Sequence, residues 1–313
     1  MSNSVPHINL LDYLEGDEAT RKQFVKTLGD GLCEFGFLTV GGHGVDRALI
    51  DRSYQKFQEF FALDEDVKKK YDCVPGNARG YTPFGREHAK DSDVPDLKEF
   101  WHVGQELPEG HDYRKDYPDN VWPNEVPGLK ETTLEMYQSV ERIGHTILRA
   151  LADYFDLPNN TFSDMAQLGD SILRAIHYPP LPNVQATHRV RAAAHEDINL
   201  ITLLPQSQGS GLEILTRQGE WMAVNAPEGD FVVDSGDMIS RATNGVVPAI
   251  RHRVLTPAEE ENRSRFSMPF FMHPYASCSL AAMDRFVSDD NPAKFPPITA
   301  REFLQERLRE IGL

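Results

Sequence analysis

The chain has 313 residues, of which 40% are hydrophobic, and its 48 acidic against 32 basic side chains give a formal net charge of -16. This composition is typical of an ordinary globular protein. A protein that binds nucleic acid or an anionic membrane surface needs positive charge, so the sequence predicts neither partner. We expect a small-molecule substrate instead. The sequence makes no prediction about the oligomeric state.

Cysteine usage and the N-terminal residues indicate where the protein works. Cys33, Cys73 and Cys278 are isolated and form no C-x-x-C pair, so neither a disulfide framework nor a thiolate zinc site is expected. The opening "MSNSVPHINLLDYL" lacks the basic and apolar regions of a signal peptide. No run of about 18 apolar residues indicates a transmembrane helix. A cytoplasmic enzyme is therefore expected.

The first half of the chain has the patterns of a mixed α/β region. Apolar residues at helical spacing predict a helix over 18–36, glycines close a predicted strand over 37–45, and Asp46 is placed to cap a second amphipathic helix over 46–63. Residues 74–128 are rich in Pro and Gly, which predicts loops with short strands. The longest helical pattern, 129–155, is followed by Leu157 and Pro158, which we expect to stop it.

After about residue 170, short apolar segments alternate with Gly, Pro and Asn turns. Such regular spacing predicts a sandwich or barrel, so the fold class is mainly β with flanking helices, around a jelly-roll core. We divide the chain into an N-terminal mixed α/β region that does not fold independently, a long supporting helix, the β core and a C-terminal helix. Their ranges are 1–125, 126–165, 166–285 and 286–313.

The stretch "AAAHEDINLITLL" places His195 two residues before Asp197, directly ahead of a strand pattern. About 1.7 pairs of this kind are expected by chance from 11 His and 48 acidic residues, so a polar pair at a strand entrance is the plain alternative. On a strand, however, residues i and i+2 share a face. His195 and Asp197 could then bind one metal ion, with Glu196 turned away.

A third ligand is expected from His252 in "AIRHRVLT", on another predicted strand of the core. A partly buried histidine bonded to the backbone is the alternative. Two histidines and one carboxylate on one face of a metal leave three positions open, which is the arrangement suited to non-haem Fe(II) and O2 chemistry. A zinc hydrolase is a further possibility for the same ligands.

Arg265 and Ser267 in "RFSMPFF" also lie at i and i+2 on a predicted strand. A guanidinium and a hydroxyl on one face can hold a carboxylate through charge-assisted hydrogen bonds. A structural salt bridge to one of the many acidic residues is the alternative. A zinc hydrolase would leave this pair without a task.

These segments, in this order, resemble the isopenicillin N synthase-like family of Fe(II)/2-oxoglutarate-dependent dioxygenases over nearly the whole chain. The segments that carry the resemblance are "GFLTVGGHGV", "YPP", "HEDINLITLL", "GLEIL" with "GEWMAV", "FVVDSGDMISRATNG", "HRVL" and "RFSMPFF". They are specific to the family and not to one member.

The resemblance implies a double-stranded β-helix fold and a role for each matching residue. His195, Asp197 and His252 would be the Fe(II) ligands. Arg265, Ser267 and Tyr178 would bind the distal carboxylate of the cosubstrate 2-oxoglutarate, whose oxidation by O2 yields succinate and CO2 while a small organic substrate is hydroxylated, desaturated or cyclised. His43 would be structural, and His177 and His188 match no functional role.

Two positions depart from the family pattern. Ile176 replaces an Asn that helps orient the cosubstrate in many plant members, and Asp234 replaces a frequent Asn. The "HED" motif also resembles isopenicillin N synthase itself, an Fe(II) oxidase that uses no 2-oxoglutarate. A non-catalytic sensor of metal or 2-oxoglutarate on the same fold is the alternative from a different class, although it would not need both sets of residues.

Substrate contacts in such folds come from loops and from the barrel mouth. We therefore expect them from residues 79–103 and from the strand that follows "RFS". The candidates, each equally compatible with plain packing, are Arg79, Tyr81, Phe84, Phe100 and Phe271.

Overall fold

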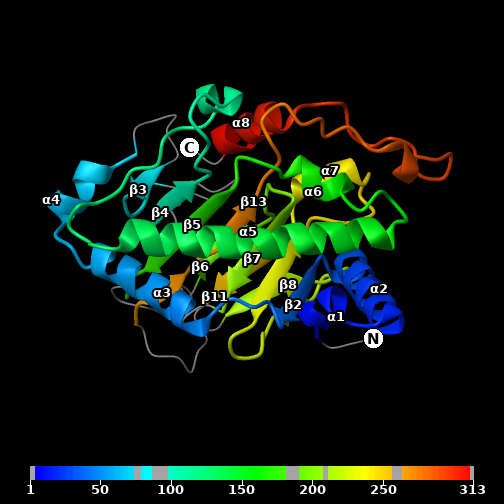
Figure 1. Cartoon of the computed structure of the whole chain (residues 1–313), viewed down its shortest axis with the longest axis horizontal. Helices are drawn as coiled ribbons and strands as arrows, with labels where there is room; N and C mark the ends of the chain where they lie inside the picture. The colour runs from blue at the N-terminus through cyan, green and yellow to red at the C-terminus, as the bar shows by residue number, and fades with distance from the viewer. Residues whose placement is uncertain are drawn as a thin grey trace.

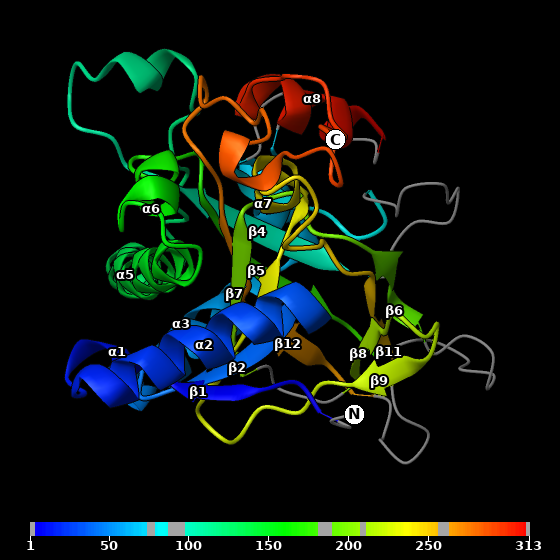
Figure 2. The ribbon, with the colours of Figure 1, turned by 90° about the vertical axis from the view of Figure 1, so that its right-hand side faces the viewer.

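The computed structural model describes residues 4–73, 79–86, 98–180, 190–206, 211–255 and 263–310. Within these ranges, two sheets form the jelly roll expected from the sequence (Figures 1 and 2). The larger sheet has the order β1-β2-β10-β7-β13-β5-β4-β3, with β12 paired to β5, and the smaller sheet has the order β6-β11-β8-β9. All pairings are antiparallel except that of β1 with β2.

The strands of the larger sheet are β1 (His7–Asn9), β2 (Phe37–Gly41), β3 (Gly80–Thr82), β4 (Glu99–Gly104), β5 (Ile172–Tyr178), β7 (Ile201–Pro205), β10 (Phe231–Ser235), β12 (Arg265–Ser267) and β13 (Phe270–Met272). Those of the smaller sheet are β6 (Val190–His195), β8 (Leu212–Leu215), β9 (Trp221–Ala223) and β11 (His252–Leu255). The N-terminal part of the chain thus contributes β1 to β4 to the same sheet as the core strands.

The helices are α1 (Leu10–Leu14), α2 (Glu18–Phe35), α3 (Arg47–Phe61), α4 (Glu65–Lys68), α5 (Leu129–Tyr154), α6 (Thr161–Met165), α7 (Asp237–Ala242) and α8 (Ala300–Glu310). The Asp46 side chain accepts a hydrogen bond from the Ala48 amide at 2.9 Å, so the expected cap of α3 is confirmed. The expected helices over 18–36 and 129–155 are confirmed as α2 and α5. None of the helices in the described ranges is long and apolar enough to cross a membrane.

Helices α3 and α5 cover one face of the larger sheet, which we call its outer face. Figure 1 shows α5 lying across the strands, and α5 contacts β7 and β13 while α3 contacts β5. The ring of Tyr137 on α5 meets that of Phe270 on β13 edge to face, with centroids 4.8 Å apart. The apolar core between helices and sheet therefore fixes the strands that carry the candidate site.

Strand β5 separates this core from the opposite, inner face of the sheet. Leu173 and Ala175 point outward and belong to the apolar core. Because side chains alternate along a strand, Arg174, Ile176 and Tyr178 point to the inner face. The inner face of β5 thus carries polar groups, although the strand is central in its sheet.

The segment "DFVVDSGDMI" differs from the strand expected from its apolar residues. It forms β10 and then, after Gly236, the short helix α7, whose first turn contains Asp237. An acidic residue in a first turn is favoured by the helix dipole, and this local preference outweighs the apolar pattern. The rest of the β core follows the expected order.

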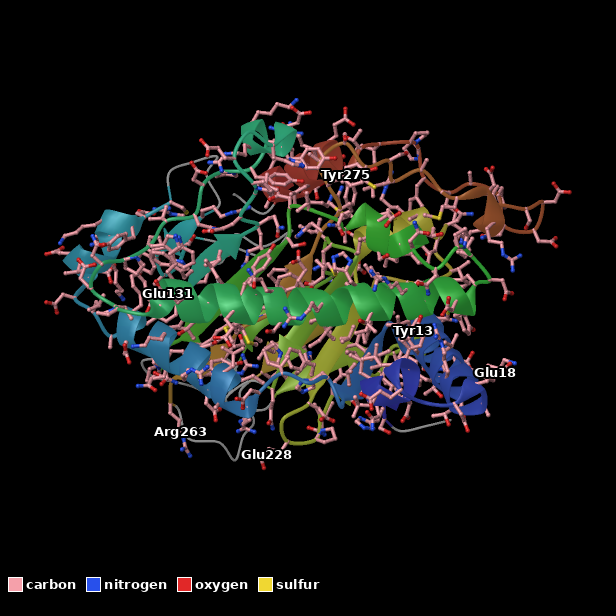
Figure 3. The ribbon with its side chains drawn as sticks, viewed as in Figure 1. Tyr13, Glu18, Glu131, Glu228, Arg263 and Tyr275 are labelled. Atoms are coloured by element: carbon pink, nitrogen blue, oxygen red, sulfur yellow. The ribbon has the colours of Figure 1, made fainter. Side chains whose placement is uncertain are left out.

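Many of the acidic residues that the structure describes lie on the surface. Figure 3 labels Glu18, Glu131 and Glu228, which are exposed on α2, on α5 and in the loop before β10. Exposed charges of one sign keep a protein dissolved but contribute little to its fold.

Glu141, in the middle of α5, is partly buried. Burial raises its pKa to about 7, opposed by the neighbouring Arg142. Between the ordinary pKa of about 4.5 and pH 7, the folded protein binds more protons at this site than the unfolded chain does. Stability contributed by this group is therefore fully present at low pH and is lost as the pH rises through this window.

We predict that Glu141→Gln is more stable than the wild type at pH 8, by up to about 3 kcal/mol, and similar to it near pH 5. Urea unfolding at the two pH values measures the difference. Glu131→Gln, on the same helix but exposed, is the matched control and should change neither value. A Glu141→Gln advantage that is equal at both pH values would contradict this account.

Candidate metal centre and cosubstrate site

Two histidines face each other across the smaller sheet. His195 ends β6 and His252 begins β11, and the antiparallel register makes them direct partners. Their ring centroids lie 4.4 Å apart. The strand pairing itself therefore brings together two residues that are 57 positions apart in the sequence.

Backbone hydrogen bonds fix the orientation of both rings. Nδ1 of His195 lies 2.7 Å from the Ala193 carbonyl oxygen, and Nδ1 of His252 lies 3.2 Å from that of Ile250. A carbonyl only accepts, so each Nδ1 carries the proton and donates it. Each Nε2 is left with the lone pair that a metal ligand needs.

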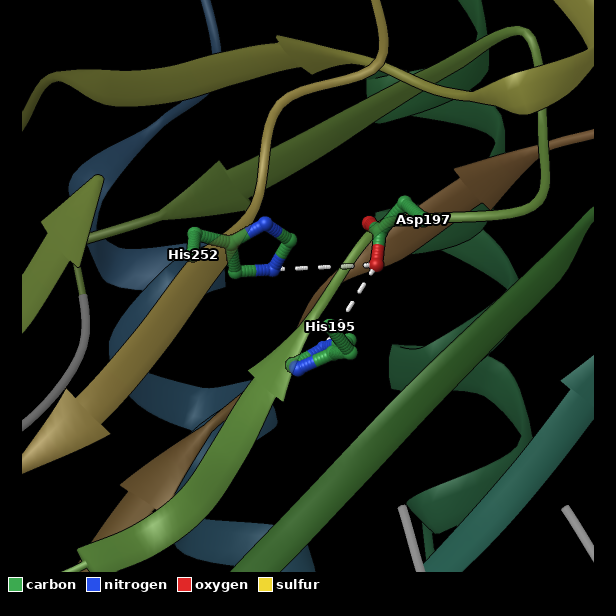
Figure 4. Close-up of side chains that lie close together, drawn as sticks. All are labelled: His195, Asp197 and His252. Atoms are coloured by element: carbon green, nitrogen blue, oxygen red, sulfur yellow. Dashed lines mark ion pairs between the residues drawn. The ribbon is translucent and has the colours of Figure 1, made fainter. Parts of the chain in front are cut away.

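Asp197 completes the cluster, but it lies in a loop and not on the expected strand. β6 ends at His195, so Asp197 lies in the loop that leads to β7, and the prediction that both residues share a strand is wrong. The loop nevertheless turns the carboxylate inward: Oδ1 lies 3.7 Å from Nε2 of each histidine (Figure 4). Glu196 is exposed, as expected.

Thr202 on β7 determines which carboxylate oxygen of Asp197 faces the histidines. Its hydroxyl donates to Oδ2 of Asp197 and accepts a 2.8 Å hydrogen bond from the Asn199 side chain. Oδ1 is thereby left for the cluster. The sequence analysis missed Thr202, which stands in the "INLIT" part of the motif.

The electrostatic state of the cluster suits a cation. Burial would raise the pKa of Asp197, but His252 and His195, with the Thr202 hydrogen bond, lower it below its usual value. Burial, together with His195, lowers the pKa of His252 to about 4. At neutral pH the site therefore offers a carboxylate and a neutral imidazole from His252.

Asp234 on β10 stands opposite Thr202 in the strand register. Burial, and then the charge of Asp197, raise the pKa of Asp234 well above its usual value. The neutral acid is therefore favoured, and it can donate a hydrogen bond to Asp197 as an amide would. This gives a physical reason why Asp can stand where the family often has Asn.

The three candidate ligand atoms fit one metal ion. They lie within 4.8 Å of one another, and the described residues contain no other such group of three or more. Ligand bonds of about 2 Å place two ligand atoms of one metal roughly 3 to 4 Å apart, as found here. Two imidazole nitrogens and one carboxylate oxygen form the facial donor set of non-haem Fe(II) sites.

Arg265, Ser267 and Tyr178 lie together on the larger sheet. β12 pairs with β5 so that Arg265 is opposite Tyr178, and the Arg265 guanidinium lies 5.3 Å from the centre of the Tyr178 ring. All three are buried, with exposed fractions of 6%, 5% and 3%. The strand expected for Arg265 and Ser267 is confirmed, and its alternation places both on one face.

Arg191 connects this group to the metal strand. It lies on β6, four residues before His195, and its guanidinium donates to the backbone carbonyls of Tyr178 at 3.2 Å and Arg263 at 2.9 Å. The two sheets are thus joined at the ends of β5 and β12. Sequence reasoning missed this residue, because its partners are backbone atoms that no motif displays.

Of the five substrate candidates, Phe100 and Phe271 lie on the inner face of the larger sheet. Phe100 packs with Ile176 and Tyr178. Phe271 pairs in register with Thr202, so it lies on the inner face.

The other three candidates, Arg79, Tyr81 and Phe84, are either buried with polar partners or exposed. Arg79 is 2% exposed and forms a 2.8 Å ion pair with Asp170, so it has a structural task. Tyr81 is fully buried and donates to Glu99 at 2.5 Å, within a polar cluster that also contains Lys68 and His177. Phe84 is 47% exposed.

Two further histidines, His43 and His177, form hydrogen bonds outside the candidate metal centre. His43 shares hydrogen bonds with the Gly229 carbonyl at 2.8 Å and the Val45 amide at 3.2 Å, so its expected structural role is confirmed. His177 joins β5 to Glu99 at 2.7 Å. His188 lies outside the described residues.

Comparisons with known proteins identify the family of the chain. Residues 5–125 match the family model "non-haem dioxygenase in morphine synthesis N-terminal", and residues 169–274 match the 2OG-Fe(II) oxygenase superfamily. A 2-oxoglutarate-Fe(II) type oxidoreductase of Aspergillus fumigatus is 29% identical over 94% of this chain and 89% of its own. A 2-oxoglutarate-dependent dioxygenase of Aspergillus rugulosus is also 29% identical, over 97% and 98%.

Solved structures extend the likeness to the whole fold. A crystal structure described as a 2OG-Fe(II) oxygenase family protein of Caulobacter crescentus is 41% identical, covers 99% of both chains and has a TM-score of 0.89. T7H of Neurospora crassa, solved with alpha-KG and thymine, is 26% identical over 97% of this chain and 96% of its own, with a TM-score of 0.87. The chain belongs to the 2OG-Fe(II) oxygenase superfamily, and it is a 2-oxoglutarate-dependent dioxygenase whose cofactors are Fe(II), 2-oxoglutarate and O2.

We predict that Thr202→Val weakens binding of Fe(II), or of Mn(II) as a redox-stable probe, by about 10- to 100-fold. Valine keeps the shape but cannot hold Oδ2 of Asp197, so the carboxylate loses its fixed orientation. Thr202→Ser keeps the hydroxyl and should bind metal like the wild type. Calorimetric titration of the metal-free protein measures the metal affinity of both variants. A Thr202→Val protein that binds metal as tightly as the wild type would show that Thr202 does not position Asp197.

Proposed function

We propose that His195, Asp197 and His252 bind the Fe(II) of this dioxygenase. We propose further that Arg265, with Ser267 and Tyr178, binds the distal carboxylate of 2-oxoglutarate. The observation that carries the proposal is the convergence of two separate donor sets. One is a carboxylate 3.7 Å from two oriented imidazoles, and the other is a buried guanidinium with two buried hydroxyl groups beside it.

Each residue has a defined task in this proposal. When bound, Fe(II) with 2-oxoglutarate activates O2 for oxidation of a C–H bond in the substrate. The two histidines present Nε2 atoms to the metal, and Asp197 adds one negative charge that lowers the cost of holding a dication. Arg265 offers a planar fork of donors that matches a carboxylate, and burial strengthens the interaction because little water competes for it.

The arrangement favours 2-oxoglutarate over the oxidase alternative. Arg265, Ser267 and Tyr178 carry three polar groups on one face of the larger sheet, which suits a small diacid whose other end reaches the metal. Ile176, at the position of the missing Asn, packs with Phe100 and Tyr178, so one amide contact is replaced by apolar packing. A sensor without catalysis would not need a metal site with open positions beside the cosubstrate group.

The substrate class proposed is a small organic molecule, oxidised by hydroxylation, desaturation or ring closure. T7H, which has been solved with thymine, supports the small size. Phe100 and Phe271 are proposed as substrate contacts because they lie on the inner face.

We predict that Arg265→Ala weakens 2-oxoglutarate binding by about 30-fold to several thousand-fold, because truncating one partner of a buried charge pair costs roughly 2–5 kcal/mol. Metal affinity should change little. Arg265→Lys should recover part of the loss, since a point charge does not reproduce the fork. Calorimetry gives both affinities, and succinate formation in air gives the turnover. An Arg265→Ala protein with wild-type affinity for 2-oxoglutarate would assign Arg265 to a structural salt bridge.

A further inference from the structure

The outer face of the larger sheet carries a buried charge network behind the proposed cosubstrate group. Glu99 on β4 lies at its centre and is 5% exposed. Its Oε2 accepts hydrogen bonds from Nζ of Lys68 at 2.8 Å and from the Tyr81 hydroxyl at 2.5 Å, and its Oε1 lies 2.7 Å from Nδ1 of His177. Burial would raise the pKa of Glu99, but the hydrogen bonds from His177, Lys68 and Tyr81 lower it below its usual value. A carboxylate only accepts, so Nδ1 of His177 carries the proton and donates it.

His177 connects this network to β12. Because its Nδ1 carries the proton, its Nε2 accepts from the Ser264 hydroxyl, which lies 3.1 Å away. Its ring also stacks on that of Phe266, with centroids 4.6 Å apart and planes 7° apart. Ser264 and Phe266 are the two chain neighbours of Arg265. The contacts of His177 therefore hold the chain on both sides of Arg265, from the face of the sheet opposite to the Arg265 side chain.

The short strand β12 depends on such contacts. It is three residues long, and among the described residues it pairs with β5 alone. So few ladder bonds leave a strand able to tilt relative to its sheet. Recognition of a ligand needs its binding groups to be held within about 0.5 Å of the productive position, by neighbours that are themselves fixed. The outer-face contacts of β12 thus bear on the direction of Arg265 on the inner face.

We propose that His177, held by Glu99, is a positioning residue for 2-oxoglutarate, because it fixes β12 from the outer face and thereby directs Arg265 at the distal carboxylate. This inference rests on the proposed function of Arg265 and adds a residue on the opposite face of the sheet. A guanidinium that is displaced loses the paired geometry in which it binds both oxygens of a carboxylate. His195 and His252 belong to the smaller sheet, so metal affinity should not depend on His177.

The network also stabilises the fold, and Lys68 allows the two effects to be separated. Its Nζ donates to Oε2 of Glu99 and to the Phe61 carbonyl, at 2.8 and 3.5 Å. Lys68→Met leaves a buried carboxylate without its cation, which lowers stability, but keeps the bond between Glu99 and His177. His177→Phe removes both hydrogen bonds of the imidazole and keeps an aromatic ring against Phe266.

The test compares two ligands by calorimetry on the anaerobic Fe(II) protein. They are 2-oxoglutarate and 2-oxopentanoate, which has the same chain length but no distal carboxylate. We expect His177→Phe to weaken 2-oxoglutarate by about 5- to 50-fold, and to leave 2-oxopentanoate and Fe(II) within about 3-fold. Ser264→Ala, which removes one hydrogen bond of an exposed side chain, should weaken 2-oxoglutarate by about 2- to 5-fold. Lys68→Met should lower the melting temperature and bind both ligands like the wild type.

The preference of the wild type for 2-oxoglutarate, measured first, separates the two proposals. A wild-type protein that binds both ligands equally overturns the proposed role of Arg265, and this inference with it. A preference that His177→Phe and Ser264→Ala both retain in full overturns the role of His177 alone, and Ser264→Ala decides if His177→Phe does not fold. Equal losses for both ligands in His177→Phe, or the same loss of 2-oxoglutarate in Lys68→Met, would reduce the network to general stability and overturn that role as well.

Discussion

The site depends first on the register between β6 and β11. Because that pairing sets His195 directly opposite His252, a shift of one residue would turn one imidazole to the other face of the sheet. The hydrogen bonds from each Nδ1 to the carbonyl two residues earlier then determine which nitrogen faces the centre. Strand pairing thus sets the distance between the two imidazole rings, and the backbone hydrogen bonds set their tautomers. The Asp197 carboxylate then needs only to face the Nε2 atoms of the two histidines.

The two donor sets belong to different sheets, so their separation has to be fixed as well. The metal ligands lie on or next to the smaller sheet, and the cosubstrate group lies on β5 and β12 of the larger one. Arg191 spans the two, since it stands on β6 and binds backbone carbonyls near the ends of β5 and β12. On the outer face, α3 and α5 pack against the larger sheet, so the wall that carries Arg265 and Arg174 is supported from behind.

Short-range patterns in the sequence predicted much of this molecule. Helical spacing located α2, α3 and α5, and the H-x-D, His and R-x-S segments located residues that the structure brings together in two groups. The prediction failed where the local conformation was decided by neighbours in space. Asp197 was expected on a strand but lies in a loop, where Thr202 and Asn199 hold it through side-chain hydrogen bonds.

Residues whose partners are distant in sequence could not be predicted. Arg174 stands in an ordinary strand pattern, and only the pairing of β5 with β4 and β13 shows that it meets Phe100, His102 and Phe271. Arg79 is a second example. The sequence left it open between a substrate contact and plain packing, and the structure places it buried beside Asp170, 91 residues away.

One metal site and one 2-oxoglutarate site are proposed to act together on this chain. The most direct measurement is an anaerobic titration of the Fe(II) protein with 2-oxoglutarate, followed in the visible spectrum. We expect a weak charge-transfer band that saturates at one equivalent per chain, is absent in His252→Ala and is unchanged in Glu196→Ala. A wild-type protein that holds iron yet develops no band, or a His252→Ala protein that develops the full band, would contradict it.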